Sequence, residues 1–197
     1  FKSGRTKKGA TMFIDYLAVM LINMAAGLAI LLCYLTGFPS HQQEKGWAGA
    51  FFAVGAVAFI YGLSMTLTWP LPGSYNIAFG EPSVLFGVLF LAAGFSIGRS
   101  QSLLPLSLYA FFAGIMAVVM GMAIINLRMT STPFLSGLGF ILTGTAGILL
   151  LPTVRFPKNI GVRILIAVVL AVGILIWAYV GYYACWGHLK NFAQWKP

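Results

Sequence analysis

Charged residues are scarce in this sequence. Asp, Glu, Lys and Arg make up 8% of its 197 residues, and only 3 of these residues are acidic. A water-soluble domain carries about 25% charged residues to cover its surface, so this composition excludes an ordinary soluble protein. Together with a mean hydropathy of +0.93, it predicts an integral membrane protein.

Histidine and cysteine are equally rare, with 2 residues of each. His41 and His188 fall beyond opposite ends of the predicted membrane spans, and Cys33 and Cys185 lie near opposite ends, about 30 Å apart. The two histidines therefore cannot share a haem iron or a metal ion, and the two cysteines cannot form a disulfide bond with each other. The chain also has no CxxCH, HExxH, Walker A or paired CxxC motif. We therefore expect no catalytic residue, no metal and no cofactor, but we expect bound lipids.

Basic residues outnumber acidic ones and give the chain a net charge of +9. They lie between, beyond or at the very ends of the apolar runs, where Lys and Arg act as interfacial anchors and topology signals. A nucleic-acid partner is therefore not expected. The end of the bundle that carries both termini has the larger share of Lys and Arg, so the positive-inside rule predicts that both termini are cytoplasmic.

Long apolar runs dominate what remains of the sequence. A helix needs about 20 apolar residues to cross the hydrocarbon core of a membrane. Continuous runs of this kind exclude a β-barrel, whose strands are shorter and alternate in polarity. The sequence predicts an all-α integral membrane bundle of six transmembrane helices in one domain, residues 12–185, after a basic N-terminal arm, residues 1–11. The six runs cover residues 13–36, 48–68, 83–98, 103–127, 134–151 and 162–183.

The C-terminal tail, residues 186–197, has an amphipathic pattern. Leu189, Phe192 and Trp195 are spaced three apart, so on a helix they share one side. This pattern predicts a short interfacial C-terminal helix that lies on the membrane surface. Trp69, Trp186 and Trp195 are predicted interfacial anchors, because indole rings settle at the membrane–water boundary.

Two pairs of apolar runs contain similar residues. Ala50-Phe-Phe-Ala53 and Ala110-Phe-Phe-Ala113 each precede a glycine, Gly62 or Gly121, by about three turns, and the runs that follow contain Gly87 and Gly139. This similarity suggests a parallel repeat of a helical hairpin. Coincidence in a sequence rich in alanine, phenylalanine and glycine is an equal alternative.

The connector after the second run, residues 69–82 with the sequence WPLPGSYNIAFGEP, is the most distinctive segment. Pro70 ends the second span, and Pro72-Gly73 is a turn signal. The apolar triplet Ile77-Ala78-Phe79 suggests a segment that dips back into the bundle as a re-entrant site. The alternative is a structural loop in which Glu81, before Pro82, caps the third helix.

Ionisable and polar residues gather near the end of the bundle that carries this connector. Glu81 and Asp15 are the two acidic residues at this end, and Arg128 or a basic residue of the N-terminal arm is the expected partner of either one. Such a cluster either binds a ligand or ion, docks a partner, or is a structural ion pair. Asn23, in the middle of the first span, is expected to form an interhelical hydrogen bond. The candidate ligand, ion or docking residues are Asp15, Tyr75, Asn76, Glu81, Arg128 and His188.

Three segments together resemble a known family. Met12-Phe-Ile-Asp-Tyr16, the connector from Thr68 to Glu81, and Trp186-Gly-His188 are similar to an uncharacterised family of prokaryotic multi-span membrane proteins, known only as a domain of unknown function. The resemblance covers nearly the whole chain from Met12. It implies a six-helix single domain in a bacterial or archaeal cytoplasmic membrane, and it transfers no activity to any residue.

Two functions from different classes follow from these features. The first is an accessory or structural subunit of a larger prokaryotic membrane protein complex, without a catalytic cofactor of its own. Its partners would be membrane lipids and either other integral membrane subunits or further copies of the chain. The alternative is a small transporter or channel with an acidic site at Asp15 and Glu81 under the 69–82 loop. A lipid-modifying enzyme is a third and weaker hypothesis, because few nucleophiles or bases lie together.

Overall fold

A computed structural model describes residues 16–37 and 45–193, and these residues contain no strand. Six helices within them are long and apolar enough to cross a membrane. This confirms the prediction of an all-α, multi-pass membrane bundle. The helices are α1 (Tyr16–Thr36), α2 (Trp47–Thr68), α3 (Glu81–Gly98, preceded by the π-helical turn η2, Asn76–Gly80), α4 (Leu104–Asn126), α5 (Pro133–Arg155) and α6 (Ile160–Phe192).

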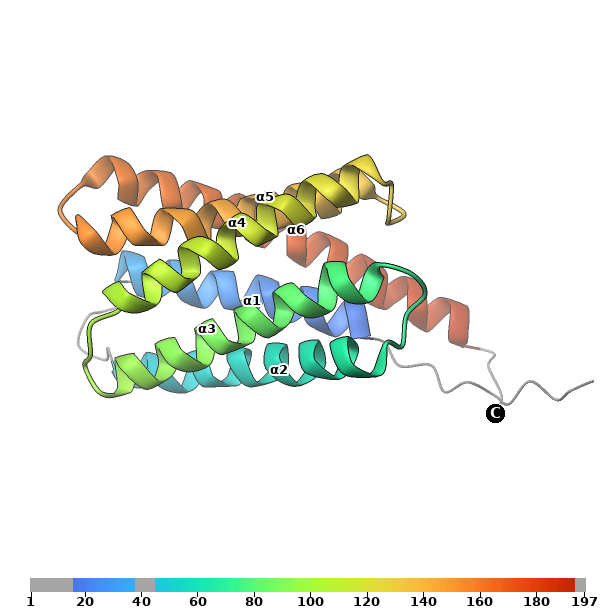
Figure 1. Cartoon of the computed structure of the whole chain (residues 1–197), viewed down its shortest axis with the longest axis horizontal. Helices are drawn as coiled ribbons and strands as arrows, with labels where there is room; N and C mark the ends of the chain where they lie inside the picture. The colour runs from blue at the N-terminus through green and yellow to red at the C-terminus, as the bar shows by residue number, and fades with distance from the viewer. Residues whose placement is uncertain (1–15, 38–44, 194–197) are drawn as a thin grey trace, which may run out of the picture.

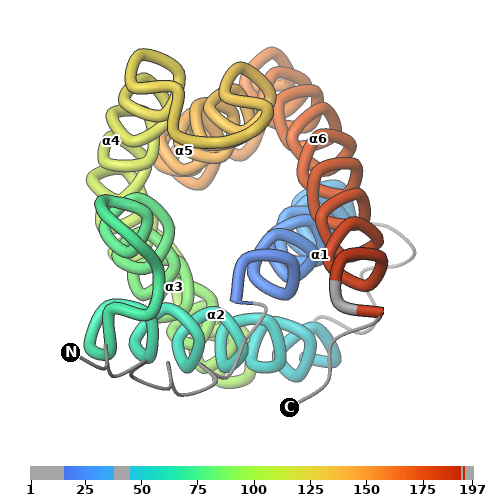
Figure 2. The backbone as a smooth tube through the Cα atoms, turned by 90° about the vertical axis from the view of Figure 1, so that its right-hand side faces the viewer, coloured from blue at the N-terminus to red at the C-terminus, as the bar shows by residue number. Residues whose placement is uncertain are grey.

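The helices form a closed ring in chain order (Figure 2). Each helix packs against its neighbours in the sequence, and α6 returns to pack against α1. The pairs α2–α3, α4–α5 and α6–α1 pack most tightly, and looser seams separate them. The thinnest seam, with the least contact between the two helices, lies between α3 and α4, which a short turn joins (Figure 1). The ring is thus three antiparallel helix pairs around a common centre.

Glycines bring the backbones of α4 and α5 together. A Cβ atom on Gly114 would lie 2.5 Å from the carbonyl oxygen of Gly144, and one on Gly121 would lie 2.5 Å from the carbonyl oxygen of Gly137. Side chains at these positions would push the helices apart. Because lipid provides no hydrophobic drive between helices, this close van der Waals contact is what holds the pair together.

The α2–α3 pair repeats this arrangement. Gly55 packs against the backbone at Gly87, and Gly62 packs against the backbone at Gly80. In each case a Cβ atom on the α2 glycine would lie 3.0 Å from a carbonyl oxygen of the other helix. In both pairs the two glycines of a helix are two turns apart. These contacts place Gly87 of α3 and Gly144 of α5 in equivalent positions. The predicted match to Gly139 is wrong, because that glycine packs against an indole ring of α6.

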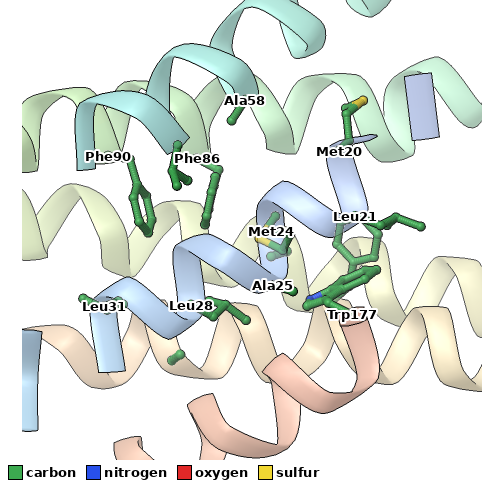
Figure 3. Packing of buried hydrophobic residues seen from close by; sticks show 14 of the residues in the cluster. Met20, Leu21, Met24, Ala25, Leu28, Leu31, Ala58, Phe86, Phe90 and Trp177 are labelled. Carbon is green, nitrogen blue, oxygen red and sulfur yellow. The ribbon is translucent and has the colours of Figure 1, made fainter. Parts of the chain in front are cut away.

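Large apolar side chains of α1, α3 and α6 meet inside the ring (Figure 3). Met24 and Leu28 lie on α1, Phe86 and Phe90 come from α3 with ring centroids 4.2 Å apart, and Trp177 of α6 is only 1% exposed. On α1, Asn23 donates a hydrogen bond of 3.0 Å to the carbonyl of Val54. This confirms the predicted interhelical role of that amide.

The predicted short C-terminal helix is not present as a separate element. Helix α6 continues without a break to Phe192 and has 33 residues, or about 50 Å at 1.5 Å per residue. Its last turns extend past the ends of α1 and α2 (Figure 1). Residues 183–192 contain no proline, and Gly187 does not have the positive φ with which a glycine often ends a helix. The transmembrane helix therefore continues beyond the bundle.

Candidate functional site

The connector between α2 and α3 is shorter than predicted. It ends at Tyr75, because residues 76–80 form a π-helical turn that continues directly into α3. Pro82 has no N–H for the carbonyl of Ala78, four residues earlier, and its ring would clash with that carbonyl in an α-helix. A π turn widens the helix at this point. The apolar triplet therefore begins the third span, and the prediction of a re-entrant loop is wrong.

Asn76 holds the short connector in place. Its side chain is completely buried. The side-chain oxygen accepts a hydrogen bond of 3.0 Å from the backbone N–H of Leu71, and its amide group donates to the carbonyls of Leu71 and Gly73. The amide thus replaces the backbone partners that the turn lacks. All of its polar atoms are used within the connector, so Asn76 has a structural role.

Tyr75 begins a row of aromatic side chains that crosses the ring. Its hydroxyl donates a hydrogen bond to the carbonyl of Met129, in the connector between α4 and α5. Its ring stacks on Phe79 at 6.2 Å, Phe79 meets the edge of Phe140 at 5.4 Å, and Phe140 meets Trp177 at 5.2 Å. This aromatic row (Tyr75, Phe79, Phe140, Trp177) links the η2 turn, α5 and α6 across the inside of the ring.

Of the two acidic residues in the predicted site, the structure describes only Glu81. Glu81 lies inside the continuous helix formed by η2 and α3, where it is in the first turn of α3 and Gly80 holds the N-cap position. The capping role predicted for Glu81 is therefore wrong. Among the described residues, Glu81 makes no salt bridge with Arg128, which is exposed and has a left-handed backbone (φ 50°) after α4. Asp15 lies outside the described residues.

His188 and two of the predicted anchors lie at the same end of the bundle. His188 is half-buried in the last turns of α6, and no group of three or more His, Cys, Asp or Glu side chains suited to a metal occurs in the described part of the chain. Trp69 and Trp186 are 49% and 72% exposed, as an interfacial role requires. Trp195 lies outside the described residues.

A cavity inside the ring is the main feature that sequence reasoning missed. It has a volume of about 110 Å³ and is lined by side chains of α1 to α5. It extends from Phe140 of the aromatic row toward the opposite end of the bundle, where Leu103 and Val154 line it. A row of small residues in α4 provides the space. Such rows also occur where helices pack closely, so the sequence alone does not distinguish a cavity wall from a helix-packing surface. These small residues are Ala110, Ala113, Gly114 and Ala117.

The few polar groups of the cavity wall are already occupied. The Ser107 hydroxyl donates to the carbonyl of Leu104 at 2.7 Å, and the Thr143 hydroxyl donates to the carbonyl of Gly139 at 2.8 Å while accepting from Trp177 Nε1 at 2.8 Å. The ring of Tyr34 packs against another ring at 5.6 Å. The wall is therefore apolar toward whatever fills the cavity.

The family of the chain follows from its sequence. A model of the family described as "Protein of unknown function (DUF981)" matches residues 11–191. The chain belongs to this family. Membership confirms the resemblance to an uncharacterised family, and the DUF981 description assigns no activity to any residue. No curated protein and no solved structure matches this chain.

Proposed function

We propose that this chain is a non-catalytic membrane protein that binds one apolar molecule, such as a lipid or isoprenoid tail, inside its helix ring. The observation that carries the proposal is the cavity of about 110 Å³ with its apolar wall. One water molecule needs roughly 10–15 Å³ and two to four polar partners. The space is far larger than that, and the hydroxyls of Ser107 and Thr143 are already bonded to backbone carbonyls.

The seam between α3 and α4 is the proposed entrance. Both helices of this thin seam contribute to the cavity wall, including the half-buried Leu89 and Ala93 of α3 and Leu106 and Ala113 of α4. An apolar tail could pass between them from the bilayer without entering water. We infer that the aromatic row limits entry from the end that carries the termini, because it lies across the ring there.

Native mass spectrometry of the gently extracted protein tests this proposal. We expect a bound apolar molecule on the wild-type chain. Ala113→Phe fills the cavity and should remove this molecule, because Ala113 lines the cavity. Ala53→Phe is the matched control, because Ala53 ends the equivalent Ala-Phe-Phe-Ala segment and is exposed on α2. Equal retention by the two variants would contradict binding inside the ring.

A role as an accessory subunit of a larger membrane complex is the second proposed function. The observation that favours it is the projecting end of α6, where Tyr182, Tyr183, Trp186 and Leu189 are each more than 60% exposed. These apolar side chains extend beyond the neighbouring helices and offer a contact surface for another integral membrane subunit or a second copy. Sizing of the gently extracted chain tests this role. Migration with larger subunits at a fixed ratio supports it, and migration as a monomer contradicts it.

The transporter hypothesis is less well supported. An ion or polar solute would need a polar path, whereas the cavity wall is apolar and the aromatic row lies across the ring. Glu81 does not line the cavity. Prokaryotic origin, the cytoplasmic membrane and the orientation of the termini remain predictions from the sequence.

A further inference from the structure

We propose that a second groove, separate from the central cavity, binds an anionic phospholipid. The groove lies where α1 and α5 end and α6 begins, and it has a volume of about 230 Å³. Leu35 is the one residue that lines both this groove and the central cavity. The occupant we infer places its phosphate on Arg163 at the rim and one acyl chain along the apolar wall.

The wall of the groove suits an acyl chain. Leu32 of α1 and Ile164, Ala167 and Leu170 of α6 line it, and the side chain of Leu170 is completely buried at its base. The small side chain of Ala167 leaves room between the two helices. An acyl chain that is already in the bilayer exchanges contacts with other lipids for contacts with this wall at little cost.

Arg163 is held at the rim in a position to bind phosphate. Its Nη2 donates to the carbonyl of Leu35 at 2.9 Å, and its Nη1 donates to the carbonyl of Pro157 at 3.4 Å. A guanidinium has five N–H donors, so these two bonds fix its plane and leave three donors for a ligand. The side chain is exposed, and arginine binds phosphate oxygens with two parallel hydrogen bonds.

The charges around the groove favour an anionic lipid over a zwitterionic one. Arg155 and Lys158 lie in the same connector region as Arg163, and all three are exposed. The one acidic side chain in the described part of the chain, Glu81, belongs to the opposite end of the bundle. Basic residues near the membrane surface attract anionic lipids.

Lipid titration followed by native mass spectrometry tests this site, with phosphatidylglycerol and phosphatidylcholine of identical acyl chains as probes. We expect wild-type protein to bind phosphatidylglycerol more tightly than phosphatidylcholine. Arg163→Gln should weaken phosphatidylglycerol binding roughly tenfold, the effect of losing one charged hydrogen-bonding group. Arg99→Gln is the matched control, because Arg99 is exposed at the same end but lies over the ring of Phe95, at 4.2 Å, and does not line the groove.

Equal losses for Arg163→Gln and Arg99→Gln would overturn the proposal, since they would show a diffuse effect of surface charge. Ala167→Phe tests the acyl-chain half and serves where Arg163→Gln fails to fold. It fills the groove while keeping every charge, so we expect it to lower phosphatidylglycerol binding. Unchanged binding would show that the tail does not occupy the groove and would also overturn the proposal. Neither variant alters Ala113, so the central cavity is tested independently.

Discussion

At the residue scale, the side chains of Asn76 and Tyr75 form hydrogen bonds with the backbone of the connectors that follow α2 and α4. The sequence shows that Asn76 and Tyr75 are unusual in an apolar chain, and it places them correctly at one end of the bundle. It does not show which way an amide or a hydroxyl points. Asn76 faces its own connector and Tyr75 reaches the carbonyl of Met129, and the residue types alone predict neither direction.

Replacing Asn76 should destabilise the protein. Asn76→Ala leaves the buried N–H of Leu71 and two carbonyls without their side-chain partner, and an unsatisfied buried group costs about 1–3 kcal/mol. Thermal unfolding in detergent measures the change. Asn126→Ala, at an exposed position at the end of α4, is the control and should change stability by less than about 0.5 kcal/mol. Equal stability of the two variants would contradict the structural role of Asn76.

Replacing Glu81 separates the binding account from the transporter hypothesis. Glu81→Gln removes the charge and keeps the shape, and Glu81 lines neither the central cavity nor the groove. We expect the variant to retain the apolar molecule and the phosphatidylglycerol to the same extent as the wild type in native mass spectrometry. Loss of either ligand with the fold intact would place the acidic residue in the site and contradict the account.

At the scale of the elements, hydropathy predicted the existence and order of all the helices but not every boundary. The third span begins at Asn76, well before Pro82, because a π turn accommodates the proline inside a continuous helix. The sixth helix continues to Phe192. The sequence did not predict this end, because the spacing of apolar residues in the tail fits a separate surface helix and an extension of the span equally well. These helix boundaries depend on packing between helices, and the pattern of apolar residues along the chain carries no information about that packing.

The glycine contacts between α4 and α5 make the next prediction. A Cβ atom at Gly144 would lie 2.4 Å from the carbonyl oxygen of Gly114 and 2.8 Å from the backbone nitrogen of Val118. Gly144→Ala should therefore separate the two helices and lower the free energy of unfolding by about 1–3 kcal/mol. At Gly49 nothing lies within 4 Å of the added atom, so Gly49→Ala should be neutral or stabilise the helix by up to about 1 kcal/mol. Chemical denaturation in detergent measures both, and similar effects of the two substitutions would contradict the close packing.

At the scale of the whole molecule, the sequence predicted a six-helix bundle but not a closed ring with a cavity. The helices are apolar around their whole circumference, since one side faces lipid and the other faces the core, so no polar boundary marks the inner side. Closure depends on contact between α6 and α1, the last and first helices in the chain. The cavity depends in turn on where small residues of α4 meet the phenylalanines of α3, which only the assembled ring determines.

Direct observation of the cavity contents tests the central claim most clearly. The measurement is a density map of the gently extracted protein, at a resolution that shows side chains. We predict elongated density that belongs to no side chain, lying between Leu28, Phe86 and Ala113 on the open side of the aromatic row. A map in which ordered water fills this space, or in which α3 and α4 close upon one another and leave none, would contradict the account.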